Sequence, residues 1–204
     1  MVQLGIYTPV FCCKDFNGDG EADILWRNAS GEVYIWLLNG LSVIGQGSLG
    51  VVGNDWQIAG IGDFNGDGKA DILWRNASGE VYIWLLNGLS AIGQGSLGVV
   101  GNDWQIAGIG DFNGDGKADI LWRHASGEVY IWLLNGLSAI AQGSLGVVGN
   151  DWQINGVGDL NGDRKADILW RNISTGNVYE WLMNGLSAIG QGSLGVVGND
   201  WYIE

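Results

Sequence analysis

Acidic side chains recur at fixed spacing in a short glycine-rich loop that the chain contains four times. Residues 63–71 read Asp-Phe-Asn-Gly-Asp-Gly-Lys-Ala-Asp, which places side-chain oxygens at loop positions 1, 3, 5 and 9. The carbonyl oxygen of Lys69, at position 7, is a further donor. Ca²⁺ takes about six to eight oxygen ligands in tolerant geometry, whereas Mg²⁺ gives up its waters less readily. The spacing therefore predicts a calcium site.

Two interpretations of this loop stay open at the level of the sequence, a calcium site or an Asp/Asn-Gly turn without an ion. Three carboxylates crowded together without a cation would repel one another, which favours the calcium site. An EF-hand is excluded, because position 12 is Trp74 where that motif needs a bidentate glutamate, and because the flanks read as strands.

The composition supports a cation requirement and excludes several classes of protein. Of the 22 acidic residues, three aspartates in each of four loops account for 12, and the net charge is −13. Four calcium ions would add eight positive charges and leave about −5. Because a surface with this much negative charge repels phosphate backbones, we expect no nucleic-acid partner. No apolar run is long enough to span a membrane.

The loops lie in a tandem repeat. Asp15, Asp63, Asp111 and Asp159 each open the same segment, and the spacing between them is 48 residues. Residues 63–110 and 111–158 differ at only four positions. We divide the single domain into repeats 8–55, 56–103, 104–151 and 152–199, followed by a short segment at 200–204.

Each repeat reads as four strands. In the second repeat these are 56–62 before the loop, 72–75 after it, 80–86 beyond a four-residue turn, and a ragged, glycine-broken segment at 89–101. The Asn87-Gly88 dipeptide predicts a hairpin turn between the last two. Arg75 and Glu80, like Arg27–Glu32 and Arg123–Glu128, flank the four-residue turn and are expected to form an ion pair across the hairpin.

The third strand indicates the architecture. Residues 80–86 are apolar on both faces, so each small sheet must be covered on both sides. Four-stranded antiparallel blades stacked around an axis meet that demand, which predicts an all-β propeller. A stacked solenoid is the alternative. The first repeat lacks its Trp strand at 8–14, and residues 200–204 supply one, so this segment is expected to close the ring as a clasp. It would complete either a four-bladed monomer or an eight-bladed ring of two chains.

The loop and the strand after it, Asp-Phe-Asn-Gly-Asp-Gly-Lys-Ala-Asp-Ile-Leu-Trp, resemble the FG-GAP/VCBS repeats that also form the propeller heads of integrin α chains. The resemblance covers residues 15–204. It implies propeller blades that carry a calcium loop, with roles in adhesion or carbohydrate recognition.

Carried over by position, the resemblance implies up to four calcium sites. Their ligands would be Asp15, Asn17, Asp19, Glu21 and Asp23; Asp63, Asn65, Asp67, Lys69 and Asp71; Asp111, Asn113, Asp115, Lys117 and Asp119; and Asp159, Asn161, Asp163, Lys165 and Asp167, with the position-7 residue of each set binding through its carbonyl. Arg164 replaces a glycine in the fourth loop, where a positive φ would strain it, so we expect that site to be the weakest.

The 12 tryptophans occupy three positions in every repeat. Burial between blades is the expected role for most of them. Stacking on sugars in grooves between blades is the alternative role, as in lectins of related propeller families, and the candidates are Trp26, Trp74, Trp122 and Trp170.

Catalysis finds little support. The single histidine, His124, replaces a turn asparagine of the other repeats, and Cys12 and Cys13 have no counterpart in them. The sequence therefore predicts a non-catalytic, calcium-stabilised module that recognises a glycan or a protein surface. A self-assembling scaffold, including a homodimer, is the alternative. The resemblance implies an extracellular location, although residues 1–13 do not read as a signal peptide.

Overall fold

A computed structural model describes residues 14–201, and every regular element in that range is a β-strand. The strands form four antiparallel sheets, one for each repeat, with neighbours in the chain also neighbours in the sheet. The all-β, four-stranded repeat predicted from the sequence is thus confirmed. The first sheet has only three strands within the described range.

The strand bounds repeat closely from sheet to sheet. The first sheet contains β1 (Ile24–Arg27), β2 (Glu32–Asn39) and β3 (Ser42–Val51). The second contains β4 (Trp56–Gly62), β5 (Asp71–Asn76), β6 (Glu80–Asn87) and β7 (Ser90–Val99). The third contains β8 (Trp104–Gly110), β9 (Asp119–His124), β10 (Glu128–Asn135) and β11 (Ser138–Val147). The fourth contains β12 (Trp152–Gly158), β13 (Asp167–Asn172), β14 (Asn177–Asn184) and β15 (Ser187–Val196).

The outer strand of each sheet is longer and more regular than its glycines suggest. In the second sheet β7 runs for ten residues and pairs with β6 across two register shifts. Asn87 pairs with Ser90, so Gly88 and Leu89 form the hairpin turn, and Gly88 has a φ of 60°. A positive φ at the first central residue alone is typical of a type II′ turn. The turn is therefore shifted by one residue from the Asn-Gly position predicted, which puts a leucine at its tip.

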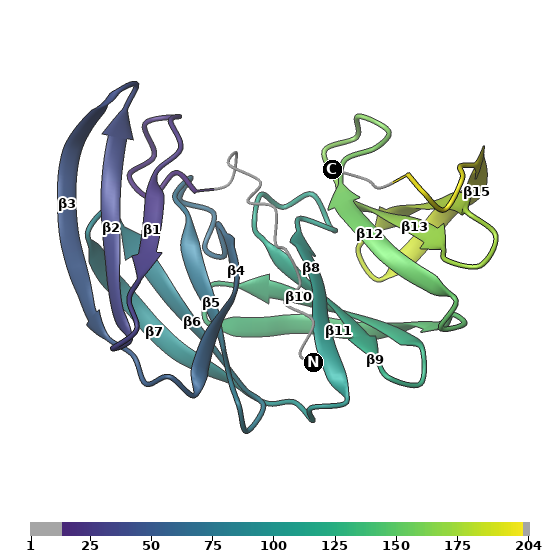
Figure 1. The fold of residues 1–204 in the computed structure, drawn as a ribbon, viewed down its shortest axis with the longest axis horizontal. Coiled ribbons are helices and arrows are strands. Elements are labelled where there is room, and N and C mark those ends of the chain that lie inside the picture. The colour runs from purple at the N-terminus through teal and green to yellow at the C-terminus, as the bar shows by residue number, and fades with distance from the viewer. Residues whose placement is uncertain (1–13, 202–204) are drawn as a thin grey trace.

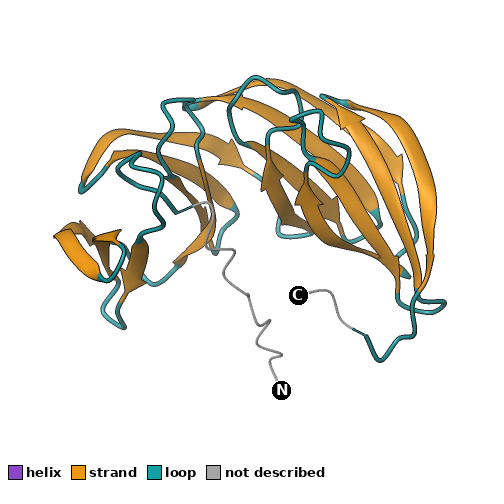
Figure 2. Cartoon of the chain, turned by 90° about the horizontal axis from the view of Figure 1, so that it is seen from above, coloured by secondary structure: helices purple, strands orange, loops and turns teal. Residues whose placement is uncertain are grey.

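The sheets stand side by side in an arch that is open on one side (Figures 1 and 2). The first strands of adjacent repeats contact each other, β4 against β8 and β8 against β12. Glycines allow this approach, since a Cβ on Gly60 would lie 1.8 Å from Cδ1 of Ile109. A Cβ on Gly108 would lie 2.4 Å from Cγ2 of Val157. Glycine on one strand and a branched side chain on the next thus set the spacing of the sheets.

The hydrophobic core lies between sheets and is divided into three clusters of the same design. The cluster between the first and second sheets joins Phe16, Val33 and Ile35 to Ile72 and Trp74. Equivalent residues fill the second and third clusters. The two middle sheets are therefore covered on both faces, as the apolar pattern of the third strand predicts. By the residues that the structure describes, the outer two sheets are covered on one face.

Within residues 14–201 the sheets do not close into a ring. The first and last sheets stand at the two ends of the arch (Figure 1). Of the predicted clasp, Asp200 and Trp201 are not in a strand and the Trp201 side chain is 67% exposed, while residues 202–204 lie outside the described range. Residues 8–14, where the first repeat was predicted to lack its Trp strand, also lie almost wholly outside the described range.

The predicted Arg–Glu pairs are wrong. Arg27 pairs with Val33 in the ladder and the Asn28 N–H donates to the Glu32 carbonyl, so Arg27 and Glu32 occupy successive rungs and point to opposite faces. Among residues 14–201 no ion pair joins an arginine to a glutamate. The prediction failed because the turn was placed one rung away from its position in the structure.

Candidate metal centre and inter-sheet contacts

Each acidic loop is folded around its first aspartate, and in the second, third and fourth repeats it connects the first strand to the second. In the second repeat Oδ1 of Asp63 accepts hydrogen bonds from the N–H groups of Gly66 (2.7 Å) and Asp67 (3.2 Å). Its Oδ2 accepts one from Gly68 at 2.7 Å. Gly66 and Gly68 have φ values of 80° and 81°, which lets the chain wrap around a single carboxylate.

The middle acidic positions repeat this pattern along the loop. The Asn65 side-chain oxygen accepts from the N–H of Asp67 at 2.8 Å, and Oδ1 of Asp67 accepts from the N–H of Lys69 at 2.9 Å. The ammonium of Lys69 lies 3.9 Å from Oδ2 of Asp67. The side-chain oxygens at positions 1, 3 and 5 thus all face into the same turn of backbone.

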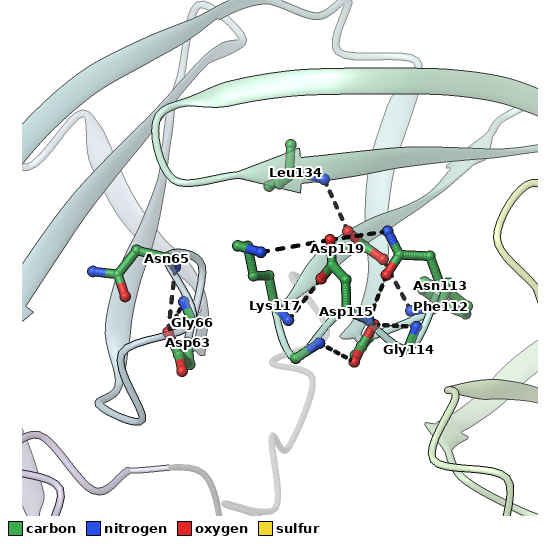
Figure 3. Close-up of polar contacts among 12 residues, drawn as sticks. Asp63, Asn65, Gly66, Phe112, Asn113, Gly114, Asp115, Lys117, Asp119 and Leu134 are labelled. Carbon is green, nitrogen blue, oxygen red and sulfur yellow. Dashed lines mark hydrogen bonds and ion pairs between the residues drawn. The ribbon is translucent and has the colours of Figure 1, made fainter.

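The last aspartate of each loop has a structural role that the sequence did not reveal. Asp71 is fully buried at the start of β5, where its Oδ2 accepts from the Phe64 N–H at 2.9 Å and its Oδ1 from the Leu86 N–H at 2.8 Å. It therefore joins the start of the loop to β6. Figure 3 shows the equivalent Asp119 in the third repeat between Phe112 and Leu134.

Burial raises the pKa of this carboxyl group. Loss of solvent raises the pKa of Asp71 to about 7, with the two N–H bonds acting in the opposite direction and the nearby Asp63 and Asp67 adding to the rise. The pKa of Asp119 is raised to about 7 for the same reasons. Burial also raises the pKa of Asp23. In the fourth loop the pKa of Asp159 is instead lowered, first by the hydrogen bond from the Arg164 N–H.

The first three loops lie next to one another. Asp15, Asp63 and Asp111 line a hollow of about 410 Å³ together with Lys69 and Lys117. Nowhere in residues 14–201 do three or more Asp, Glu, His or Cys side chains converge as a set that could hold a metal ion by themselves. An ion at a loop would therefore need the amide of the asparagine and the carbonyl at position 7 beside the carboxylates, and the sequence provides both in every copy.

Arg164 departs from the other loops as expected. Its φ is 67°, and it is the only residue other than glycine with a positive φ among those the structure describes. Its N–H still donates to Oδ2 of Asp159 at 2.8 Å, as the glycine N–H does in the other loops. The fourth loop therefore keeps the shape of the other loops, but its backbone is strained at Arg164, because a residue with a Cβ adopts the left-handed conformation there.

The tryptophans proposed for sugar stacking divide into two groups. Trp74, Trp122 and Trp170 are 1% exposed and pack between sheets, so their suggested contact with a ligand is corrected to a structural role. Trp26 is 46% exposed, because within residues 14–201 no sheet covers its side of the first repeat. Each buried indole lies under an arginine of the preceding repeat, with Arg27 5.3 Å above the ring centroid of Trp74.

These arginines also hold the linkers between sheets. The Arg27 guanidinium donates to the carbonyls of Val52 (3.1 Å) and Gly53 (2.9 Å), and Arg75 and Arg123 make the equivalent bonds. The sequence offered one signal for this role, since each of these arginines directly follows a repeated tryptophan. We predicted a glutamate on the same hairpin as the partner, whereas the arginine contacts the linker at the end of its own repeat and the tryptophan of the next repeat.

His124 forms a network with Ser126 and Asp103, at 2.6 Å from each. This hydrogen bond is the main reason that the pKa of Asp103 is lowered. The trio has the side chains of a hydrolytic triad, but in the second repeat Asn76 contacts Ser78 and Asp55 in the same way. His124 thus replaces an asparagine as the cap of a turn.

Fold and loops together define a repeat module built of β-sheets. The model of the FG-GAP-like repeat matches residues 15–74, 63–122 and 111–170, which together span more than half of the chain. The chain therefore belongs to the FG-GAP repeat family, whose repeats form non-catalytic modules and are typically extracellular. No curated protein matches the chain. Within residues 14–201 there is no helix of the length and apolar character that crossing a membrane requires.

Proposed function

We propose that this chain is a calcium-stabilised, non-catalytic β-sheet module that recognises an extracellular partner. The observation that carries the proposal is the loop at Asp63 and its three equivalents, in which carboxylate and amide oxygens face one turn of backbone. Burial, and after it repulsion from the aspartates of the loop, raises the pKa of Asp71, and a divalent cation would relieve the repulsion.

The donor set suits calcium better than other biological cations. Carboxylate, amide and carbonyl oxygens are hard ligands that Ca²⁺ accepts in irregular geometry. Modules that operate outside cells bind calcium with dissociation constants of about 10⁻⁴–10⁻³ M, which matches a loop that opens to solvent. The fourth loop is proposed to bind most weakly, because Arg164 brings a positive charge next to the ion.

Thermal unfolding with excess EDTA and with millimolar Ca²⁺ or Mg²⁺ tests the ion. Calcium at about ten times its dissociation constant would stabilise the folded chain by about 1.4 kcal/mol for each independent site. We expect the midpoint of unfolding to rise by many degrees with Ca²⁺ and by less with Mg²⁺. An unchanged midpoint in Ca²⁺ would remove the proposal.

A quadruple substitution sharpens this test. Asp→Asn at position 5 of every loop keeps the oxygen that accepts the backbone N–H and removes one negative charge per site; the residues are Asp19, Asp67, Asp115 and Asp163. The calcium-induced rise should shrink while the unfolding midpoint in EDTA stays the same or increases. Glu→Gln at Glu32, Glu80, Glu128 and Glu180 changes the net charge equally outside the loops and should leave the calcium response intact.

The partner of the module is proposed to be a glycan or a protein surface. Screening a glycan array in Ca²⁺ and in EDTA tests this, because a partner bound through the calcium-stabilised fold should be lost in EDTA. Of the four indoles suggested for sugar stacking, only Trp26 is accessible. The alternative, a scaffold that binds only itself, is supported by a separate observation on the two end sheets.

A further inference from the structure

The three interfaces between neighbouring sheets use one set of backbone contacts. In each, the N–H of the loop alanine donates to the carbonyl of the first loop aspartate of the preceding repeat, as Ala70 does to Asp15 at 2.7 Å. The N–H of the hairpin glycine donates to the carbonyl that follows this aspartate, as Gly88 does to Phe16 at 2.7 Å. The remaining pairs are Ala118–Asp63, Ala166–Asp111, Gly136–Phe64 and Gly185–Phe112.

Side chains repeat in the same way. The leucine at each hairpin tip packs on a glycine in the outer strand of the preceding sheet, Leu89 against Gly47 in the first interface. Leu137 against Gly95 and Leu186 against Gly143 are the other two pairs. A small residue facing a large one at a fixed position makes these surfaces complementary.

The first sheet presents one half of this interface without a partner among the described residues. Leu41, the tip leucine of the first repeat, is fully exposed, whereas its three counterparts are partly covered. Trp26 is 46% exposed, and its three counterparts are buried. The Gly40 N–H donates to the side chain of Glu21 in its own sheet in place of a carbonyl of a preceding one.

The last sheet presents the other half. Leu160 is 46% exposed, whereas the phenylalanines at its position in the first three repeats are fully buried. A Cβ added to Gly158 or Gly192 would meet no described atom within 4 Å, unlike the equivalent glycines Gly110 and Gly143. The carbonyls of Asp159 and Leu160 receive none of the interface hydrogen bonds that their counterparts receive.

Two departures from the repeat add opposite charges to these two faces. At the interior interfaces a position-7 lysine lies over the preceding loop, with Cγ of Lys69 3.3 Å from a Cβ added to Gly18. The first repeat has Glu21 at position 7, and the last loop has Arg164 at position 6. If the last sheet met the first as interior sheets meet, Glu21 would face the loop that contains Arg164.

A single chain cannot bring these faces together without altering its interior. The first and last sheets are separated at the ends of the arch (Figures 1 and 2). Rotating the sheets toward each other would require new packing of β4 against β8 and of β8 against β12. The glycines there already leave no room for a Cβ, at 1.8 Å for Gly60 and 2.4 Å for Gly108. Such close packing resists a change of angle.

We propose that the last sheet of one chain docks on the first sheet of a second copy, through the contacts that join sheets within the chain. Such a contact is heterologous, and two copies joined twice in this way close into a ring of eight sheets. The tip leucine, Leu41, enters the glycine-lined surface at Gly192, and Glu21 leaves the Gly40 N–H to pair with Arg164. None of these side chains is a proposed calcium ligand, since Glu21 would bind through its carbonyl. Because Glu21 and Arg164 lie in proposed calcium loops, the docking is tested both with and without the ion.

The mass of the whole chain in solution, measured by light scattering after gel filtration, tests the docking in Ca²⁺ and again in EDTA. We expect a dimer. Leu41→Asp should raise its dissociation constant at least about 100-fold, since two buried leucines are lost per ring. Ile44→Asp is the matched control, because Ile44 and its counterparts Ile92, Ile140 and Ile189 are exposed in every repeat. A chain that is monomeric at high concentration, or a dimer indifferent to Leu41→Asp, would overturn the proposal.

A charge exchange tests the orientation of the contact. Glu21→Arg and Arg164→Glu should each raise the dissociation constant about tenfold, because each places like charges together twice in the ring. The double variant should recover most of the loss. Single variants whose effects add in the double variant would overturn the proposed pairing. If a monomeric Leu41→Asp chain keeps its glycan or protein partner, partner binding does not depend on assembly. If the wild-type chain is monomeric and binds a glycan at Trp26, the docking proposal is contradicted.

Discussion

Asp71 and its counterparts stabilise the fold and are also proposed to help hold a calcium ion. The Asp71 carboxylate joins the loop to β6 through two N–H bonds and is buried, yet it lies close enough to Asp63 and Asp67 for their charges to raise its pKa. A buried carboxylate with neighbouring like charges is costly unless hydrogen bonds or a cation offset it. The backbone provides two such bonds, and calcium is proposed to provide the rest.

At the residue scale, Arg164→Gly should stabilise the chain. The left-handed conformation of a residue with a Cβ costs about 1–2 kcal/mol, and the added freedom of glycine in the unfolded chain returns about 0.4–1 kcal/mol. The free energy of unfolding in denaturant should therefore rise by about 0.5–1 kcal/mol. The measurement belongs in the Leu41→Asp background and in EDTA, so that neither assembly nor ion binding contributes.

The reverse substitution at the equivalent position is its control. Gly68 has a φ of 81° and open space where a Cβ would be, so Gly68→Arg adds strain without a clash. It should lower the free energy of unfolding by about 1 kcal/mol. Equal stability of all three proteins would show that the positive φ carries no measurable strain.

At the scale of the element, the strands nearest the middle of the arch depend on glycine for their spacing. β8 contributes Gly108, whose added Cβ would lie 2.4 Å from Val157 on β12. The equivalent Gly156 on β12 has only Leu169 of its own sheet nearby, at 3.7 Å. The same residue in the same repeat position is therefore under different constraints, depending on whether another sheet follows.

Gly108→Ala and Gly156→Ala form a matched pair. Overpacking of a close interface costs about 1–3 kcal/mol, so Gly108→Ala should lower the free energy of unfolding by about that amount. Gly156→Ala should change it by less than about 0.5 kcal/mol in the Leu41→Asp background, because the added Cβ would meet only Leu169 of its own sheet, at an ordinary contact distance of 3.7 Å. Chemical denaturation of both variants measures the difference, and equal losses would contradict this account of sheet spacing.

At the scale of the whole molecule, charge is the dominant feature. The net charge is −13, and 12 of the 22 acidic residues lie in the four loops, of which the first three place Asp15, Asp63 and Asp111 around one hollow. Repulsion between such charges destabilises a compact state and is screened by salt over about 10 Å at 0.1 M. The lysines at position 7 offset part of it, with Lys117 3.7 Å from Asp115.

The midpoint of unfolding in EDTA should therefore rise as NaCl is increased from about 0.05 to about 1 M, where the screening length falls to about 3 Å. The quadruple Asp→Asn variant at position 5 should show a smaller rise, because four of the repelling charges are gone. Thermal unfolding followed by circular dichroism measures both. A midpoint that falls with salt, or an equal rise in the variant, would place the repulsion outside the loops.

Much of the architecture is local and could be predicted from the sequence. The repeat, the strands and the loops follow from periodicity, from glycines at positive φ and from side-chain alternation, all of which operate within about 48 residues. The positive φ at Arg164 was also predictable, because the residues on either side of it in the loop repeat those of the second and third copies and fix the same loop shape.

Contacts between repeats were decided by the tertiary structure, because a periodic sequence does not state which copy meets which. Arg27 stacks on Trp74 and bonds the linker at Val52, although its sequence neighbour Glu32 offered a charge. A shift of one rung in the hairpin was enough to turn the two side chains to opposite faces. Likewise Trp26 and Trp74 occupy one repeat position, yet only the second is buried. The sequence by itself determined the repeated unit and its loop. The tertiary structure decided which faces of the sheets are covered and which remain free to dock. The physical reason is that coverage depends on the packing angle between sheets, which is set by contacts between residues distant in the chain.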